Sequence, residues 1–348
     1  MQMNTATTQS AWRNDLLRQG AAFEHDRVVH FGDRDAELSQ AEVATACSPL
    51  TDYRTLRVGG KDAGAFLQAQ LTCDVRLITG VHAQLGGYCT PKGRLLATFL
   101  AWMHDADYML QVPATLAETV AARLHRYVLR SNVTVDVDPG LALIGLTGPH
   151  ATRAMAEILG SAADAPLKVV RSGSIVAIRA FGESLVVAVP ETQVLDLWER
   201  LLGHARPAGA PAWEWGQIQS GVVWITPPTQ DLFLPQMVGL DANGGVSFDK
   251  GCYPGQEIVA RAHYLGDLKR QLYRVHSDIN SEPGDGLFAT GSAEPVGTVV
   301  NAAPAPRGGW DALAVLRREA LHQEIRLART SGPMVTALAP AGAAMSAA

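Results

Sequence analysis

Short apolar runs, separated by glycine, proline and charged residues, predict alternating strands and helices up to about residue 140. The run at 53–58 stops at two glycines, and apolar residues from 63 to 71 then recur at helical spacing. Pro113 begins a helix with an apolar stripe of Leu116, Val120, Leu124 and Val128. Further strands are predicted at 95–101, 108–112 and 133–137. Together these elements predict a first α/β module over residues 1–140.

The same order of strands and helices returns after residue 140. Strands are predicted at 141–146, 175–178 and 185–189, with helices after 148 and at 194–202. This repetition predicts a second α/β module, to which we assign residues 141–265.

From Gly266 the pattern changes to short β-prone pieces between glycine and proline turns. Such pieces predict a small antiparallel β-barrel, which we place at 266–331. Residues 332–348 are rich in alanine, glycine, serine and proline and carry no charge, so they are predicted to be a disordered tail. The predicted fold class is α+β.

Composition narrows the range of partners. The net charge of -5 disfavours broad capture of nucleic acid or of an anionic membrane, so contact with nucleic acid is expected to be absent or indirect. Neither a signal-peptide h-region nor an apolar run of membrane-spanning length is apparent, which predicts a cytoplasmic protein without membrane contact. The four cysteines contain no Cys-x-x-Cys pair, so no metal site is predicted.

The most distinctive segment is Lys-Gly-Cys-Tyr-Pro-Gly-Gln-Glu-Ile-Val-Ala-Arg, residues 250–261. Its glycines and proline predict a tight loop around Cys252. Lys250 and Arg261 flank this thiol, and nearby cations favour a thiolate if the fold brings them close. Composition alone favours the alternative that Cys252 is a small buried apolar residue.

This segment resembles the signature of the YgfZ family, which is similar to the folate-dependent aminomethyltransferase of the glycine cleavage system and includes an iron–sulfur assembly factor. Two other segments carry the resemblance: Gln68-Ala-Gln-Leu-Thr-Cys-Asp-Val75, with Ala69 in place of a glycine, and the Lys92-Gly-Arg94 turn. The resemblance implies two ferredoxin-like modules and a barrel around a central pocket for tetrahydrofolate. We expect Asp74 to cap a helical turn rather than to bind a ligand.

The resemblance also implies site residues. Cys252 is the expected functional thiol at the rim of the pocket, and Lys250 and Arg261 are expected to favour its thiolate. Gln219 stands where the family has a glutamate facing the pterin, and its amide can both donate and accept. The other residues assigned to the cofactor or the loop are Gln236, Phe248, Tyr253, Gly255, Gln256 and Glu257, with core or turn roles as the alternative for Gln236 and Phe248.

The implied function is that of a folate-binding accessory protein for iron–sulfur assembly or repair in client enzymes, including those that modify tRNA. Its partners are then folate and iron–sulfur client or assembly proteins, with a transient cluster at Cys252 left open. One alternative is a one-carbon transferase, but Ala97-Thr98 stands where the aminomethyltransferases have an acidic pair. The other alternative is a scaffold with an empty pocket.

Overall fold

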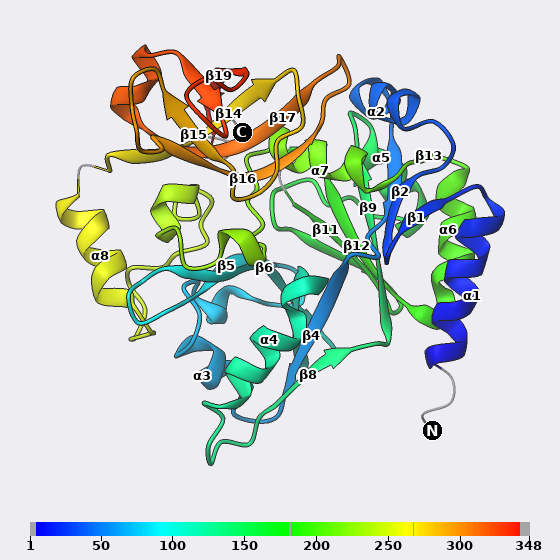
Figure 1. Ribbon diagram of the computed structural model, residues 1–348. Helices are drawn as coiled ribbons and strands as arrows, with labels where there is room; N and C mark the ends of the chain where they lie inside the picture. Colours follow the sequence, from blue (N-terminus) through cyan, green and yellow to red (C-terminus); the bar gives the residue numbers. More distant parts are fainter. Residues whose placement is uncertain (1–4, 181, 267, 342–348) are drawn as a thin grey trace.

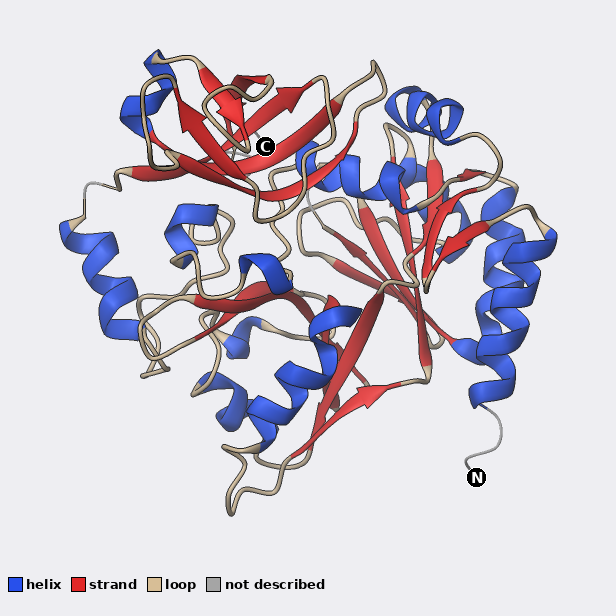
Figure 2. Cartoon of the chain, viewed as in Figure 1, coloured by secondary structure: helices blue, strands red, loops and turns tan. Residues whose placement is uncertain are grey.

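The computed structural model describes residues 5–180, 182–266 and 268–341. They form two sheets, each with helices packed against it, and a barrel that lies across one end of both sheets (Figure 1). Figure 2 shows the same arrangement by element type, with strands at the centre of each unit and most helices outside. No helix of the described residues is long and apolar enough to cross a membrane. The predicted α+β fold with a C-terminal barrel is confirmed.

The first module is a five-stranded sheet with strand order β5-β6-β7-β4-β8 and antiparallel neighbours throughout. Helix α4 buries Leu116, Val120 and Leu124 and leaves Arg123 exposed, as its apolar period predicts. The elements are β4 (Tyr53–Gly59), α3 (Ala63–Gln68), β5 (Gln84–Cys89), β6 (Leu95–His104), β7 (Asp107–Pro113), α4 (Ala114–His125) and β8 (Thr134–Asp138).

The second module repeats this plan with one insertion. Its strand order is β10-β11-β12-β9-β3-β13, so β9 takes the place of β4, and β3 is inserted before the edge strand. In both modules a strand, a helix, three antiparallel strands and another helix follow one another. The elements are β9 (Leu141–Thr147), α5 (Ala151–Leu159), β10 (Val169–Ser172), β11 (Ile175–Arg179), β12 (Leu185–Pro190), α6 (Val194–Leu202) and β13 (Arg206–Pro207).

The N-terminal segment packs on the second module, so the predicted first module of 1–140 is wrong at its start. Trp12 and Leu16 share a core with strands β9 to β12, and the Trp12 ring meets Trp198 edge-on at 5.2 Å between centroids. β3 also pairs with β9. The segment comprises α1 (Thr5–Arg18), β1 (Ala22–Glu24), β2 (Arg27–His30), α2 (Arg34–Val43) and β3 (Ala46–Pro49).

The segment after α7 returns to the first module, so the assignment of 141–265 to the second module is wrong at its end. Val222, Ile225 and Val259 share a core with the first sheet. The backbone at Asp231 and Phe233 bonds to Leu95 at the start of β6. The elements here are α7 (Ala210–Gln219), the 3-10 turns η3 (Pro227–Thr229) and η4 (Pro235–Val238), and α8 (Gln256–Leu265).

The barrel is closed by pairing between β14 and β19. Disorder from residue 332 onward is therefore wrong for Met334–Pro340, because ladder hydrogen bonds hold this strand and Val335 is buried. Residues 342–348 lie outside the described residues. The strands are β14 (Arg270–Ser277), β15 (Gly286–Ala289), β16 (Gly297–Pro304), β17 (Trp310–Arg317), β18 (Ile325–Leu327) and β19 (Met334–Pro340), with the turn η5 (Arg318–His322).

Candidate functional site

A cavity of about 770 Å³ lies where the first sheet, α4, α7, the β1–β2 hairpin and the barrel meet. Asn301 of the barrel fixes one wall, because its amide accepts from the Trp224 backbone N–H at 2.9 Å and donates to the Trp224 carbonyl at 2.8 Å. The volume is typical of a site for a small organic molecule. The apolar part of the wall includes Ala114, Ala117, Val137, Ile218, Val222 and Trp224.

Helix α7 has two functional faces: one lines the cavity, and the other contacts the barrel. Glu214, Gln217 and Ile218, spaced three and four residues apart, line the cavity. Trp215 and Gln219 instead donate to the Asp311 carboxylate of the barrel, at 3.0 and 2.9 Å. The amide nitrogen and oxygen of Gln219 are both occupied, the oxygen by Arg274 at 2.6 Å. Gln219 therefore joins the helix to the barrel. It was predicted to bind the cofactor, but it is not among the described residues that line this cavity.

Gln217 is the residue of α7 that lines the cavity and carries an unpaired amide. Its side chain is 3% exposed, and neither amide atom has a hydrogen-bond partner among the described residues. Buried polar atoms are almost always paired, so an unpaired amide on a cavity wall marks a position for a ligand. Sequence reasoning missed Gln217, although its spacing from Glu214 was a usable signal.

Charged groups gather at one end of the cavity around Arg27. The Arg27 guanidinium binds Glu214 through two hydrogen bonds, at 2.6 and 3.1 Å, and lies 3.9 Å from the Asp52 carboxylate. Burial, and then repulsion by Glu214, raise the pKa of Asp52 to about 7. Asp52 Oδ1 is buried without a hydrogen-bond partner among the described residues. It therefore offers a second unused polar atom to a ligand.

The raised pKa of Asp52 predicts a pH dependence of stability. The folded chain holds this proton up to about pH 7, whereas an unfolded aspartate loses it near pH 4, so stability falls as the pH rises through this window. We expect the free energy of unfolding to fall by about 2 kcal/mol more in the wild type than in Asp52→Asn between pH 5 and 8. Urea unfolding curves at several pH values measure this difference, and parallel profiles for the two proteins would contradict it.

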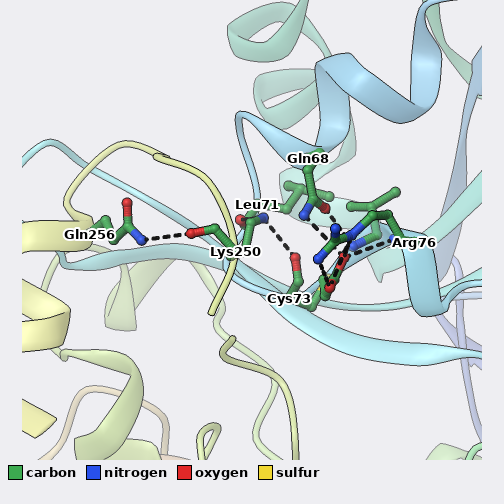
Figure 3. Close-up of polar contacts among 8 residues, drawn as sticks. Gln68, Leu71, Cys73, Arg76, Lys250 and Gln256 are labelled. Atoms are coloured by element: carbon green, nitrogen blue, oxygen red, sulfur yellow. Dashed lines mark hydrogen bonds and ion pairs between the residues drawn. The ribbon is translucent and has the colours of Figure 1, made fainter. Parts of the chain in front are cut away.

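The signature loop is anchored elsewhere, on the segment 68–76 of the first module (Figure 3). Lys250 is 7% exposed, and its ammonium donates to the carbonyl oxygens of Leu71 and Cys73, at 2.6 and 2.7 Å. Burial lowers the pKa of Lys250 to about 8. Lys250 is thus an anchor of the loop backbone, and among the described residues no hydrogen bond links its ammonium to Cys252.

The carboxylate of Asp74 completes this anchor. It accepts from the backbone N–H of Arg76 at 3.1 Å and caps the 3-10 turn η1 (Val75–Leu77), so the predicted capping role is confirmed. Gln68 also donates to it at 3.0 Å. Hydrogen bonds from Arg76 lower the pKa of Asp74 to about 2.

Two glycines let the loop sit directly on the Lys92-Gly-Arg94 turn. Gly255 has φ of 83°, and a Cβ added there would lie 2.5 Å from the Gly93 Cα. Gly93 has φ of 72°, and its added Cβ would contact the Gly255 carbonyl at 3.2 Å. No other residue type fits both the positive φ and the close approach at Gly255. The fold therefore brings together the three sequence segments that carried the family resemblance.

Most of the remaining predicted residues hold this loop or the adjacent helix. Gln236 donates to the Val259 carbonyl at 2.6 Å, and Gln256 donates to the Lys250 carbonyl at 3.4 Å. Phe248 stacks on His263 with 3.8 Å between ring centroids. Tyr253 is 6% exposed, and burial strongly raises the pKa of its hydroxyl. These contacts give the residues structural roles at the loop.

None of the predicted cofactor residues is among the described residues that line the cavity, and neither is Cys252. The predicted placement of the thiol at the cavity rim is therefore wrong. α8 follows the loop at the edge of the molecule opposite α1, with the cavity elements between them (Figure 1). Cys252, Glu257 and Arg261 are exposed there, so the predicted accessibility of the thiol holds.

Comparison with known proteins places the chain in a family. The model of the GCVT N-terminal domain matches residues 21–214. The tRNA-modifying protein YgfZ of Edwardsiella ictaluri is 30% identical over 244 residues, which cover 67% of this chain and 72% of that protein. The chain belongs to the YgfZ branch of the GCVT family. Its YgfZ relative in Colwellia psychrerythraea is 30% identical over 66% of this chain and 71% of that protein.

A solved structure shows how far the shared fold extends. Aminomethyltransferase T of the glycine cleavage system from Bartonella henselae superposes with a TM-score of 0.76 over 95% of this chain and 96% of that chain, at 15% identity. Both α/β modules and the barrel of this YgfZ-family chain therefore follow the aminomethyltransferase fold.

Thr98 has a structural role in this member of the family. It is 3% exposed, donates from its hydroxyl to the Val223 carbonyl at 2.8 Å and accepts from the Ile225 N–H at 3.0 Å. Neither Ala97 nor Thr98 is among the described residues lining the cavity. This position of the strand therefore supplies no ionisable group to the site.

The four cysteines of this YgfZ-family protein differ in accessibility. Cys47, Cys73 and Cys89 are buried, and burial raises the pKa of the Cys73 and Cys89 thiols to about 12. We expect an aromatic disulfide reagent to modify one thiol per native chain and all four after denaturation, because thiolate access controls the rate. Spectrophotometric thiol counting tests this, and rapid native modification of Cys252→Ser would contradict it.

Proposed function

We propose that this chain is a folate-binding accessory protein that supports the assembly or repair of iron–sulfur clusters in client enzymes, including enzymes that modify tRNA. Its YgfZ-branch membership supports this proposal, since curated relatives carry the name tRNA-modifying protein YgfZ. The proposed compartment is the cytoplasm, where four free cysteines stay reduced.

The cavity at the junction of the modules and barrel is the observation that carries the folate part of the proposal. A pterin has flat apolar faces and an edge of alternating donors and acceptors. The cavity of about 770 Å³ offers apolar walls, the unused amide of Gln217 and the unused oxygen of Asp52. An amide both donates and accepts, and a carboxylate accepts, so these groups fit such an edge. Tetrahydrofolate, when bound, carries one-carbon groups.

An accessory role is favoured over one-carbon transfer by the structure around Thr98. The competing proposal is an aminomethyltransferase, a kind of enzyme that carries an acidic pair at this position of the strand. Thr98 is committed to the backbone of Val223 and Ile225 and offers no carboxylate there, and the carboxylates that line the cavity, such as Asp52 and Glu214, come from other elements. Folate-dependent turnover of a methylated amine by the purified protein would reverse this preference.

The exposed loop provides the proposed contact with clients. Cys252 is the exposed cysteine of the chain, and no group of three or more His, Cys, Asp or Glu side chains in the described residues is arranged to hold a metal ion. The donors in the described part of the chain therefore do not fit a resident cluster. In the proposal Cys252 meets the client's cluster or thiols during transfer or repair, and the exposed Arg261 and Glu257 of the following helix are available to the same partner.

The test replaces Cys252 by serine in cells that depend on the protein. We expect client cluster enzymes to lose activity while the purified variant keeps its folding and its affinity for tetrahydrofolate. Asp249→Asn, at a neighbouring exposed position, is the matched control and is expected to behave as the wild type. Full client activity with Cys252→Ser at equal abundance excludes the thiol role. Absence of folate binding by the wild type instead favours a scaffold with an empty pocket.

A further inference from the structure

A second, smaller cavity of about 150 Å³ lies beside the first and contains an unpaired buried carboxylate. It is enclosed by α1, the β1–β2 hairpin and the first strand of the second module. Asp26, Tyr53 and Arg54 line both cavities and form the partition between them. Trp12, Phe23, Leu50, Leu141, Ala142 and Leu143 give it largely apolar walls.

Glu191 is the unusual residue of this cavity. It is 6% exposed, and among the described residues its Oε2 atom has no hydrogen-bond partner. It opens the 3-10 turn η2 (Glu191–Gln193), a turn that has no side-chain cap among the described residues. A buried carboxylate without a partner is costly, and its usual compensation is a cation or a donor. Burial raises the pKa of Glu191 to about 7.

The cations near Glu191 are committed to other acceptors. Arg54 donates to the carbonyl oxygens of Thr51 and Tyr53, at 2.7 and 2.9 Å, and to Asp26 at 3.2 Å. Arg13 donates to the His25 carbonyl at 3.1 Å. Its guanidinium also lies over the Phe23 ring at 3.9 Å. Neither arginine forms an ion pair with Glu191 among the described residues.

The other carboxylates of the cavity already have partners. Asp138 binds Arg57 at 2.9 Å and accepts from the Gly140 N–H at 2.7 Å. Asp26 pairs with Arg54. The unpaired carboxylate oxygen of this cavity is therefore Oε2 of Glu191, and the residue lines a space walled by hydrocarbon and by aromatic rings.

We propose that the cavity bounded by Trp12, Phe23, Ala142 and Glu191 binds a small organic cation, an alkylammonium or guanidinium ion, with Glu191 as its counter-ion. A cation supplies the missing donor to Glu191, and its alkyl part replaces water against the apolar wall. The indole of Trp12 adds attraction for a cation lying on its face. A cavity of this size accepts a molecule of about six heavy atoms. This site is distinct from the proposed folate cavity and does not depend on it.

The experiment titrates propylammonium chloride into the full chain and follows the indole resonances by NMR, with 1-propanol as the uncharged probe of equal size. We expect saturable millimolar binding of propylammonium and at least tenfold weaker binding of 1-propanol. Glu191→Gln, which keeps the shape of the side chain, is expected to weaken propylammonium binding at least tenfold. Glu199→Gln, at an exposed position of α6, is the matched control and is expected to bind as the wild type.

Ala142→Val narrows the cavity without changing a charge. This variant tests the location of the site independently of Glu191, and we expect it to bind propylammonium more weakly. Equal binding of the two probes by the wild type overturns the proposal, as does full propylammonium binding by Glu191→Gln. Binding that is lost in Asp52→Asn but kept in Glu191→Gln places the cation in the larger cavity and also overturns it. Tetrahydrofolate affinity is measured on the same Glu191→Gln sample and is expected to be unchanged.

Discussion

Replacing Gln217 by leucine is expected to raise the stability of the protein while it lowers its affinity for tetrahydrofolate. Both amide atoms of Gln217 are buried without a partner among the described residues, so an apolar side chain of similar size removes an uncompensated desolvation penalty. We expect the free energy of unfolding to rise by about 1–2 kcal/mol. The same change removes the donor and acceptor offered to a pterin, so the affinity is expected to fall about tenfold to a hundredfold.

Gln111→Leu is the matched control for this experiment. Gln111 is 0% exposed, and its two amide atoms also have no partner among the described residues, but it does not line the cavity. Its replacement is expected to stabilise the fold and to leave folate affinity unchanged. Chemical unfolding and calorimetric titration of the two variants separate the effects. Equal loss of affinity in both variants would show that the amide at Gln217 has no specific role.

Replacing Lys250 by methionine is expected to destabilise the protein and to release the signature loop. The carbonyl oxygens of Leu71 and Cys73 lose their buried charged donor, which costs about 2–4 kcal/mol of unfolding free energy. Amide hydrogen exchange across residues 249–256 is expected to accelerate, because the loop then loses its charged anchor on the carbonyls of Leu71 and Cys73. Lys92→Met, an exposed lysine in the adjoining turn, is expected to change neither property.

The difference between wild type and Lys250→Met is expected to grow with pH. The pKa of Lys250 is lowered to about 8 in the folded chain, against about 10.5 when it is unfolded. Between these values the unfolded chain holds more protons, so this lysine adds stability as the pH rises, about 2.5 kcal/mol between pH 7 and pH 10. Unfolding free energies at pH 7 and pH 10 measure this growth. A constant difference would mean that the ammonium is not buried as described.

Local sequence patterns predicted most elements of the fold but not all their partners. The stripe on α4 and the strand–helix order of both modules follow from periodicity, which is a local property. The pairing of β3 with β9 and the packing of Trp12 on Trp198 join residues far apart in the chain, and periodicity carries no information about them. Strand β19 was missed because its order comes from backbone hydrogen bonds to β14 and β18, which a weakly apolar sequence does not reveal.

The candidate site was predicted less well, because the direction in which each side chain points matters there as much as the spacing of residues along the chain. Gln217 and Gln219 differ by two residues, which places them on opposite faces of a helix, and only the first faces the cavity. Lys250 is two residues from Cys252 in sequence, yet its ammonium reaches the carbonyls of the 71–73 segment. The conformational need for Gly255 could be anticipated from the sequence, but its contact with Gly93 could not.

The claim that the junction cavity holds a pterin is tested most directly by calorimetric titration of tetrahydrofolate into the wild type and into Ala114→Trp. Ala114 is a half-buried residue of the cavity wall at the start of α4, where an indole fills the space without altering a charge. We predict saturable one-site binding by the wild type and at least a hundredfold loss in the folded variant. Undiminished binding by Ala114→Trp, or no binding by the wild type, would contradict the assignment of this cavity to folate.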